Sequence, residues 1–239
     1  MDATIDTRTQ NLHVGCGHAR LDGWLNADLY PTEATDICFD LQAEWPFATN
    51  SQCQVYGAHV VEHLAQWQIF FQQAWRVLRP DGILHIRVPY GGHPAAWWDF
   101  GHVRPWFVEN FVFFQPGYSQ SIGNPQHDGW QWPFAVESLD IRVSEPVARC
   151  LSYVPGRTLR SWVLPWILQG SYAIEELLVK MRPLKTEAEV RRWFTLRSPN
   201  SLLVRYVAWQ HHWQRRVLPP GEEVEIQTIA VGSCLNGYA

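Results

Sequence analysis

The chain has 239 residues, of which 46% are hydrophobic and 18% are charged, and its formal net charge is −4. This composition predicts a single packed domain over residues 1–239 and excludes a disordered chain. The acidic balance excludes general affinity for DNA, and 14 Trp residues form an aromatic load that needs a core, a pocket or an interface.

Short apolar runs that end in turn signals predict strands at residues 12–14, 24–29, 36–41 and 53–58. A helix is predicted over residues 62–78, where apolar side chains recur at helical spacing. The turn Arg79–Gly82 ends this helix, and a strand follows at residues 83–88. Strand, helix and strand at this spacing form a βαβ unit, so the fold class is α/β with a largely parallel sheet.

Residues 89–132 are rich in Gly and Pro, and a long irregular stretch after a strand predicts an active-site loop region. Further strands are predicted at residues 134–143 and 224–231. Between them, residues 151–220 carry a net charge of +7 and are expected to form a basic, aromatic, helical insertion before the last strand. A capping box at Thr186 and Glu189, and Ser198 followed by a proline, predict helix starts within it.

Three turns at successive strand ends carry the residue types of a nucleoside site. Gly15 and Gly17 flank Cys16 after the first strand, where glycine allows close backbone approach to a ligand. Asp28 ends the second strand and could accept hydrogen bonds from ribose hydroxyls, and Asp40 ends the third and could bind an adenine amine. Because ligands bind at the carboxyl ends of parallel strands, these positions predict one site.

The motifs LHVGCG, GWLNADL, FDL, VYGAHVVEHL and RVLRPDGILHIRVP occur in this order over residues 11–90. This stretch resembles the class I S-adenosylmethionine (SAM)-dependent methyltransferases, in particular the small, methyltransferase type 11-like group with a short connection between the first two strands. Residues 101–107, GHVRPWF, resemble a segment that these proteins carry after the fifth strand. The sequence departs from the common pattern at His13, Gln54 and Asp81.

The resemblance implies a Rossmann-like fold with a seven-stranded, mostly parallel sheet, helices on both faces and an antiparallel last strand. It also implies a SAM-binding core at residues 11–90, with S-adenosylhomocysteine (SAH) as the product. The residues that it assigns to the cofactor are Gly15, Cys16, Gly17, Asp28, Leu29, Asp40, Leu41, Ala58 and His59.

The sequence His59-Val60-Val61-Glu62-His63 also matches the inverted zinc-protease pattern H-x-x-E-H, in which Glu175 or Glu176 would supply a third ligand. A second interpretation is a divalent-metal site, because some methyltransferases resemble this segment with E-x-x-E-H. Here His59, Glu62, His63 and His102 would hold a metal that orients a substrate hydroxyl. The remaining interpretation is that Glu62 and His63 only cap and pack the helix start.

Methyl transfer from a sulfonium needs proximity and alignment, and a protonated acceptor also needs a base. His59 and His102 are the leading candidates for that base, and Tyr90 is a further catalytic candidate in the loop region. His93, Asp99 and Arg104 lie in the same loop. Five Trp residues of this region could wall an acceptor pocket or form a satellite core: Trp97, Trp98, Trp106, Trp130 and Trp132.

We therefore expect a SAM-dependent methyltransferase that acts on an O or N nucleophile of a small, aromatic or anionic acceptor. The alternatives are an RNA or nucleotide-linked substrate held by the basic segment, and a non-catalytic interaction protein on the same fold. Five Cys residues without a C-x-x-C pair, a polar start and the lack of a long apolar run predict a cytoplasmic monomer or homodimer without a membrane span.

Overall fold

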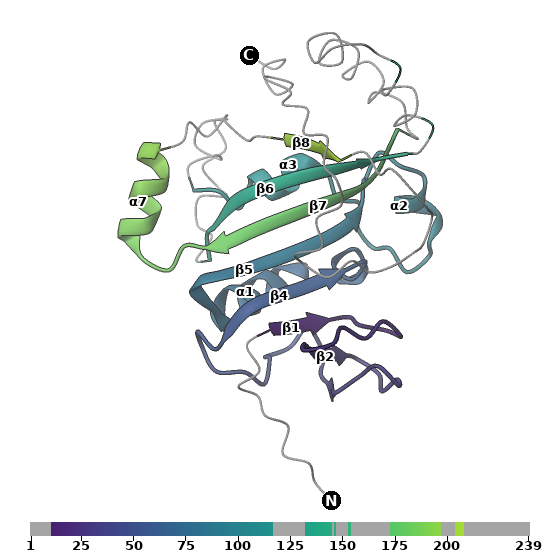
Figure 1. Ribbon diagram of the computed structural model, residues 1–239, viewed down its shortest axis with the longest axis horizontal. Coiled ribbons are helices and arrows are strands. Elements are labelled where there is room, and N and C mark those ends of the chain that lie inside the picture. The colour runs from purple at the N-terminus through teal and green to yellow at the C-terminus, as the bar shows by residue number, and fades with distance from the viewer. Residues whose placement is uncertain are drawn as a thin grey trace, which may run out of the picture.

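The computed structural model describes residues 11–116, 132–144, 146, 153, 173–196 and 204–207 of the chain, with the backbone alone given at 109, 112, 193–196 and 204–207. Its centre is one eight-stranded sheet (Figure 1). The strands are β1 (Asn11–Val14), β2 (Leu25–Asp28), β3 (Ile37–Cys38), β4 (Gln52–Ala58), β5 (Leu78–Pro89), β6 (Phe134–Val143), β7 (Ile174–Pro183) and β8 (Val204–Val207).

The strand order is β3-β2-β1-β4-β5-β7-β6-β8. Strands β1 to β5 pair in parallel with one another, β7 is antiparallel to both β5 and β6, and β8 is parallel to β6. The expected α/β fold, with a mostly parallel sheet and one antiparallel strand, is therefore confirmed. The eighth strand extends the sheet beyond β6.

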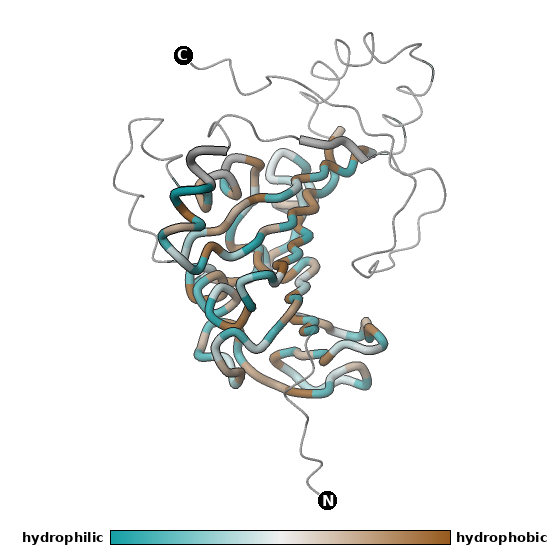
Figure 2. The backbone as a smooth tube through the Cα atoms, turned by 60° about the vertical axis from the view of Figure 1, so that its left-hand side comes forward, coloured by the Kyte–Doolittle hydropathy of each residue, from teal (hydrophilic) through white to brown (hydrophobic). Residues whose placement is uncertain are grey.

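The helices are η1 (Val61–His63), α1 (Trp67–Val77), α2 (Ala95–Trp98), α3 (Val108–Val112) and α7 (Glu187–Leu196). Helices α1 and α3 lie behind the sheet in Figure 1, and helices on its other face remain a prediction. The core between these helices and the strands is strongly aromatic. Its buried rings include Phe70, Phe71, Trp106, Phe111 and Phe114. Figure 2 shows hydrophobic and hydrophilic residues alternating along the strands, as expected for elements that bury one face more deeply.

The antiparallel strand lies where the sequence predicted a helical insertion. Residues 174–183 form β7, and the predicted last strand at residues 224–231 lies outside the described residues. The prediction of a helix after Ser198 is also wrong for residues 204–207, because these residues form β8. Glu176 and Lys180 have the i, i+4 spacing of a helical ion pair, but the segment instead pairs with β5 and β6, and these pairings outweigh the local pattern.

The local signals at Thr186 are confirmed. Helix α7 begins at Glu187, and the amide of Glu189 donates to Thr186 Oγ1 (3.2 Å), while Glu189 Oε2 accepts from the amide of Thr186 (2.9 Å). These reciprocal hydrogen bonds are a capping box. Among the described residues, no helix has the length and apolarity that crossing a bilayer requires.

The helix predicted over residues 62–78 is shorter in the structure. A 3₁₀ turn occupies Val61–His63, the backbone at Leu64 is extended, and α1 begins only at Trp67. The expected turn Arg79–Gly82 lies within β5, whose register on β4 jumps from Leu78 to Ile83. These four residues therefore bulge out of the ladder between two paired segments.

Candidate active site

The carboxyl ends of β1, β2, β4 and β5 lie at one edge of the sheet, on the right in Figure 1, because these strands run in parallel. The turns after β1, β2, β4 and β5 therefore meet at this edge, and η1 directly follows β4 there. In open α/β sheets this is the edge at which ligands bind.

The glycine turn after β1 has two different roles. Gly15 has a φ of +63°, and a Cβ at this position would lie 2.5 Å from Val60 Cγ2. Gly15 is therefore required for packing against the turn after β4. Gly17 has a φ of +52°, but a Cβ there would meet no atom within 4 Å. The backbone at Gly17 consequently has open space beside it, into which a ligand can come close.

Asp28 joins the turn after β1 to the end of β2. Its Oδ2 accepts a hydrogen bond from the amide of Gly17 (2.7 Å), and its Oδ1 accepts from the amide of Tyr30 (3.3 Å). The hydroxyl of Thr32 donates to the Gly17 carbonyl and fixes the following peptide group, so both sides of Gly17 are held. Each carboxylate oxygen has a second lone pair, so Asp28 can still accept from ribose hydroxyls.

Asn26 holds the short connection between β1 and β2 in place. Its buried side-chain amide donates to the carbonyls of Leu21 (3.1 Å) and Trp24 (3.0 Å) and to Asp36 Oδ2 (3.1 Å). Its Oδ1 accepts from the amide of Leu21 (2.9 Å) and from His13 Nδ1 (3.0 Å). Burial lowers the pKa of His13, so this histidine is a neutral structural group.

The other residues assigned to the cofactor lie on the same edge with less support. Asp40 is exposed, and its Oδ1 accepts from the amide of Gln42 (2.8 Å), which makes it the first residue of a turn. Leu41 is buried and its carbonyl accepts from Trp45 Nε1 (3.2 Å), whereas Leu29 is exposed. The structure thus places these residues beside the site without showing a contact that a cofactor would make.

His59 directly follows β4 and has a positive φ of +54°, which is uncommon for a residue with a side chain. Its Nε2 lies 3.1 Å from Glu176 Oε1, and its Nδ1 lies 3.4 Å from Glu62 Oε1. Burial opposes the charge on this ring, but the two carboxylates outweigh it and raise the pKa of His59 to about 9. Because both ring nitrogens already face carboxylates, the geometry does not favour His59 as a general base.

Glu176 and Arg87 belong to the site, although the sequence reasoning considered Glu176 only as a zinc ligand and did not consider Arg87. Glu176 accepts from Arg87 Nε (2.8 Å), from Arg142 Nη1 (3.0 Å) and from His59, and His59 and Arg87 hold its pKa far below the ordinary value despite burial. Arg87 and Glu176 come from neighbouring strands β5 and β7. An arginine near the carboxyl end of the strand predicted at residues 83–88 was the available signal.

The H-x-x-E-H segment does not form the protease pattern. His59 lies outside η1 and faces Glu176, so it does not share a helix face with His63. The structure instead brings Glu62 and His63 together with His102, and each of the three offers a ligand atom within 4.8 Å of the others. Glu62 is only 2% exposed. Three of the four residues in the expected metal set therefore lie together, without His59, and metal binding stays a prediction.

The third catalytic candidate, Tyr90, is placed at the end of β5. Its amide donates to the Glu175 carbonyl (2.9 Å), and its ring packs edge-on against Phe107 at 5.6 Å between ring centroids. Tyr90 thus lies near the start of β7, on the edge that also carries His59. Its catalytic role stays a prediction, as does that of His102.

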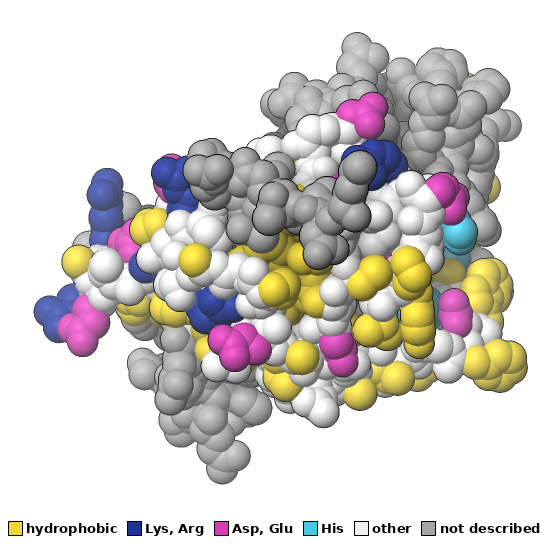
Figure 3. Space-filling model, turned by 90° about the horizontal axis from the view of Figure 1, so that it is seen from below, with side chains coloured by type: hydrophobic (Ala, Val, Ile, Leu, Met, Phe, Trp, Pro, Cys, Tyr) yellow, Lys and Arg dark blue, Asp and Glu magenta, His cyan; other side chains and the backbone are white. Residues whose placement is uncertain are grey.

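The Trp residues of the loop region divide into two groups. Trp106 is buried in the core and Trp132 packs against it, whereas Trp97 and Trp98 are 65% and 68% exposed; Trp130 lies outside the described residues. Phe100 is fully exposed beside them. Figure 3 shows hydrophobic side chains gathered at the right-hand end of the molecule, next to acidic and His side chains. The loop thus presents aromatic surface beside the strand ends.

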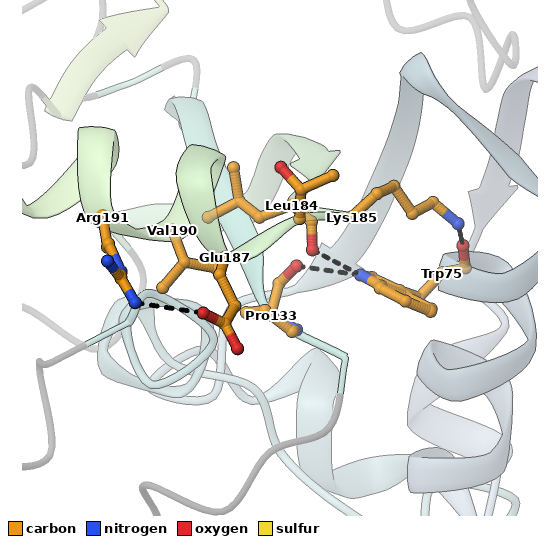
Figure 4. A pocket seen from close by; sticks show the side chains of 8 residues that line it. Trp75, Pro133, Leu184, Lys185, Glu187, Val190 and Arg191 are labelled. Carbon is orange, nitrogen blue, oxygen red and sulfur yellow. Dashed lines mark hydrogen bonds and ion pairs between the residues drawn. The ribbon is translucent and has the colours of Figure 1, made fainter.

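A separate cavity of about 320 Å³ lies between α1, the segment that follows β7, and α7, at the end of the sheet opposite the strand ends described above (Figure 4). The side chain of Trp75 lines this cavity. Its Nε1 donates to the carbonyls of Pro133 (3.1 Å) and Leu184 (3.3 Å). Lys185 and the pair Arg191–Glu187 lie at its rim. This cavity is not part of the predicted site.

Three solved structures illustrate how remote the structural similarities are. A putative methyltransferase from Bacillus halodurans is 14% identical with a TM-score of 0.42, and the match covers 72% of this chain and 91% of that one. A SAM-dependent methyltransferase from Mesorhizobium loti is 15% identical with a TM-score of 0.40, covering 72% and 90%. An O-methyltransferase from a Brevibacillus brevis multienzyme, solved with SAH, is 12% identical with a TM-score of 0.42, covering 78% and 71%.

These similarities are too remote to identify an acceptor, and no curated protein matches the chain significantly. A family model, described as "Methyltransferase domain", matches residues 12–86. This range contains the glycine turn, Asp28, Asp40 and the segment from His59 to His63. The resemblance noted in the sequence is thereby confirmed for this segment alone: residues 12–86 match the methyltransferase-domain model.

Proposed function

We propose that this protein transfers a methyl group from SAM to an O or N nucleophile of a small-molecule acceptor. The observation that carries the proposal is the hydrogen bond between Asp28 and the amide of Gly17. It places a carboxylate directly beside a glycine whose Cβ side is open, at the ends of two adjacent parallel strands. A carboxylate suits the ribose hydroxyls of a nucleoside cofactor, and the open backbone beside it leaves room for the methionine part of SAM.

The residues at this edge fit the cofactor in type as well as in place. Asp28 would hold the ribose, Gly17 would allow the methionine part to approach the backbone, and the turn at Asp40 and Leu41 would lie against adenine. In this proposal residues 11–90 hold the cofactor, and the loop region at residues 89–132 faces the acceptor. SAM, when bound, supplies a methyl group on a positively charged sulfur, which is already activated for displacement.

The remaining task of this chain is to align the acceptor and exclude water. The side chains available for it are the exposed aromatic rings of Trp97, Trp98 and Phe100. Flat apolar rings suit an aromatic or cationic acceptor. The charged side chains at the site are Arg87, Arg142 and Glu176. Because hydrogen bonds join them in one network, they orient one another, and none of them offers an isolated charge to the acceptor.

The described part of the basic segment does not favour an RNA acceptor. Arg182 pairs with Glu137 (2.9 Å), and Arg191 pairs with Glu187 (3.1 Å). Lys185 Nζ donates to the Trp75 carbonyl instead of facing solvent. The carboxylates beside these arginines reduce the local positive potential that would attract phosphates.

The acceptor class can be tested with SAM that carries a labelled methyl group. The protein is incubated with labelled SAM and, in separate reactions, with the small-molecule fraction and the RNA fraction of a cell extract. We expect label to enter the small-molecule fraction with wild-type protein and to disappear with Asp28→Ala. Transfer of label only into RNA would contradict the small-molecule acceptor while leaving methyl transfer intact.

A further inference from the structure

We propose that Glu62, His63 and His102 form a binding site for a divalent transition metal of the Zn²⁺ type. Glu62 and His63 lie in η1, directly after β4, and His102 lies in the loop after α2. The amide of Val103 donates to the Glu62 carbonyl (2.9 Å), which holds the loop against η1. The ligand atoms of the three side chains lie within 4.8 Å of one another.

Both histidines have the orientation typical of metal ligands, in which one ring nitrogen faces a backbone carbonyl. His63 Nδ1 faces the Gly101 carbonyl at 3.0 Å, and His102 Nδ1 faces the Ala96 carbonyl at 3.2 Å. A carbonyl oxygen only accepts, so in both rings Nδ1 carries the proton and Nε2 is the atom left for a metal. Nε2 of His102 also lies 3.7 Å from Asp99 Oδ2. Metal-binding histidines commonly donate one nitrogen to a backbone carbonyl in this way, which fixes the ring and the tautomer. The rings meet edge-on, 4.7 Å apart between centroids.

Glu62 supplies an independent indication of a ligand. Its side chain is 98% buried, and neither carboxylate oxygen has a hydrogen-bond partner. The nearest cationic group is His59, whose Nδ1 lies 3.4 Å from Oε1. This ion pair offsets only part of the cost of burying the carboxylate, because neither oxygen has a hydrogen bond and buried carboxylates are normally hydrogen-bonded or coordinate a metal. A dication between Glu62 and the two imidazoles would remove this cost.

The donor set decides which metals fit. Two imidazole nitrogens and one carboxylate suit Zn²⁺, Co²⁺ or Fe²⁺, whereas Mg²⁺ prefers oxygen ligands alone. Three protein ligands leave a coordination position open, as in metal sites that act on a substrate rather than sites that only stabilise a fold. If the proposed function is right, this open position would lie on the acceptor side of the turn after β4; metal binding itself does not depend on that function.

Metal binding can be measured on the full-length protein without SAM or an acceptor. The protein is stripped with a chelator, dialysed and titrated with Co²⁺, and the visible absorption of the bound ion is recorded before Zn²⁺ or Mg²⁺ is added as a competitor. We expect one equivalent of Co²⁺ to bind, Zn²⁺ to displace it and Mg²⁺ to leave it in place.

Two variants and a matched control locate the ion. Glu62→Gln and His102→Gln should each weaken Co²⁺ binding by at least about tenfold, because even partners of metal ligands contribute that much. His18→Gln should bind as wild type does, since His18 forms an exposed pair with Glu33 (2.8 Å). Circular dichroism shows whether each variant is folded, and His102→Gln carries the test if Glu62→Gln does not fold.

The proposal is overturned if stripped wild-type protein binds neither Co²⁺ nor Zn²⁺, or if both variants bind as tightly as wild type. It is equally overturned if Mg²⁺ displaces Co²⁺ at comparable concentration. A protein that binds SAH but no metal contradicts this proposal alone. A protein that binds the metal but not SAH contradicts the proposed function alone.

Discussion

Asp28 Oδ2 accepts a hydrogen bond of 2.7 Å from the amide of Gly17, and this single contact ties the ends of β1 and β2 together at the candidate active site. In the proposed function Asp28 holds the ribose, and a ligand can approach the backbone at Gly17. The contact joins these two residues. Substitutions in this turn therefore affect both stability and binding.

The two glycines of the turn after β1 should respond differently to alanine. Gly15→Ala places a methyl group 2.5 Å from Val60 Cγ2 in addition to the cost of its positive φ. We expect a loss of about 3 kcal/mol in the free energy of unfolding. Gly17→Ala meets no neighbouring atom and should lose only about 1 kcal/mol, the cost of the left-handed backbone. Urea unfolding of both variants measures this, and equal losses would contradict the packing role of Gly15.

Asn26 should be required for the short connection between β1 and β2. Asn26→Ala removes the partners of His13, Leu21 and Asp36 within a buried site, so we expect a loss of about 3 kcal/mol in urea unfolding. Asn26→Asp should lose at least as much, because it brings a second carboxylate against Asp36 and cannot donate to the Leu21 carbonyl. A loss below about 1 kcal/mol for either variant would show that the network is not required.

Glu176 should stabilise the junction of β5, β6 and β7. Glu176→Gln keeps the shape of the side chain but leaves Arg87 and Arg142 without their shared carboxylate, and we expect a loss of about 3 to 5 kcal/mol. The neighbouring Glu175→Gln is the matched control. Glu175 contacts only one of these arginines, with Oε2 lying 3.3 Å from Arg142 Nε, so its loss should be smaller. The reverse order of the two losses in urea unfolding would contradict the proposed network.

His85 should make the protein lose stability in mild acid. Burial, together with repulsion from Lys180 on β7, lowers the pKa of His85 to about 4, and its Nε2 lies 3.1 Å from Gln54 Oε1 on β4. The unfolded chain takes up the proton near pH 6.5 and the folded chain only near pH 4, so stability falls as the pH drops between these values. The total loss is about 3 kcal/mol.

Urea unfolding at several pH values between 7 and 4 measures this loss. His85→Gln should remove most of the difference in slope relative to wild type, whereas His18→Gln, at an exposed position, should keep the slope of wild type. If His85→Gln loses stability with falling pH as steeply as wild type does, then His85 is not the group responsible.

The first half of the fold could be predicted from the sequence because its signals are local. Turn residues mark the ends of the first two strands, and the interval from β4 to β5 has the length of a βαβ unit. Strand β6 was predicted with the bounds that the structure has, Phe134–Val143. Asp28 and Gly17 were placed at adjacent strand ends by the same reasoning, and the structure brings them into contact.

Strand β7 could not be predicted because its evidence is not local. The segment IEELLVKMRP carries Glu and Lys at helical spacing, and the burial of Glu176 is possible only because Arg87 and Arg142 face it from the two neighbouring strands. The position of His59 was missed for the same reason, since its partner Glu176 is 117 residues away. Pairings over such distances appear only once the sheet is assembled.

The central claim is that the edge at Gly17 and Asp28 binds a SAM-derived cofactor, and calorimetric titration of the full-length protein with SAH tests it most directly. We predict that wild-type protein binds SAH at micromolar concentration, that Asp28→Asn binds at least about tenfold more weakly because charge-assisted hydrogen bonds to the ribose are lost, and that the exposed control Asp22→Asn binds as wild type does. Failure of folded wild-type protein to bind SAH, or equal affinity of Asp28→Asn and wild type, would contradict the account.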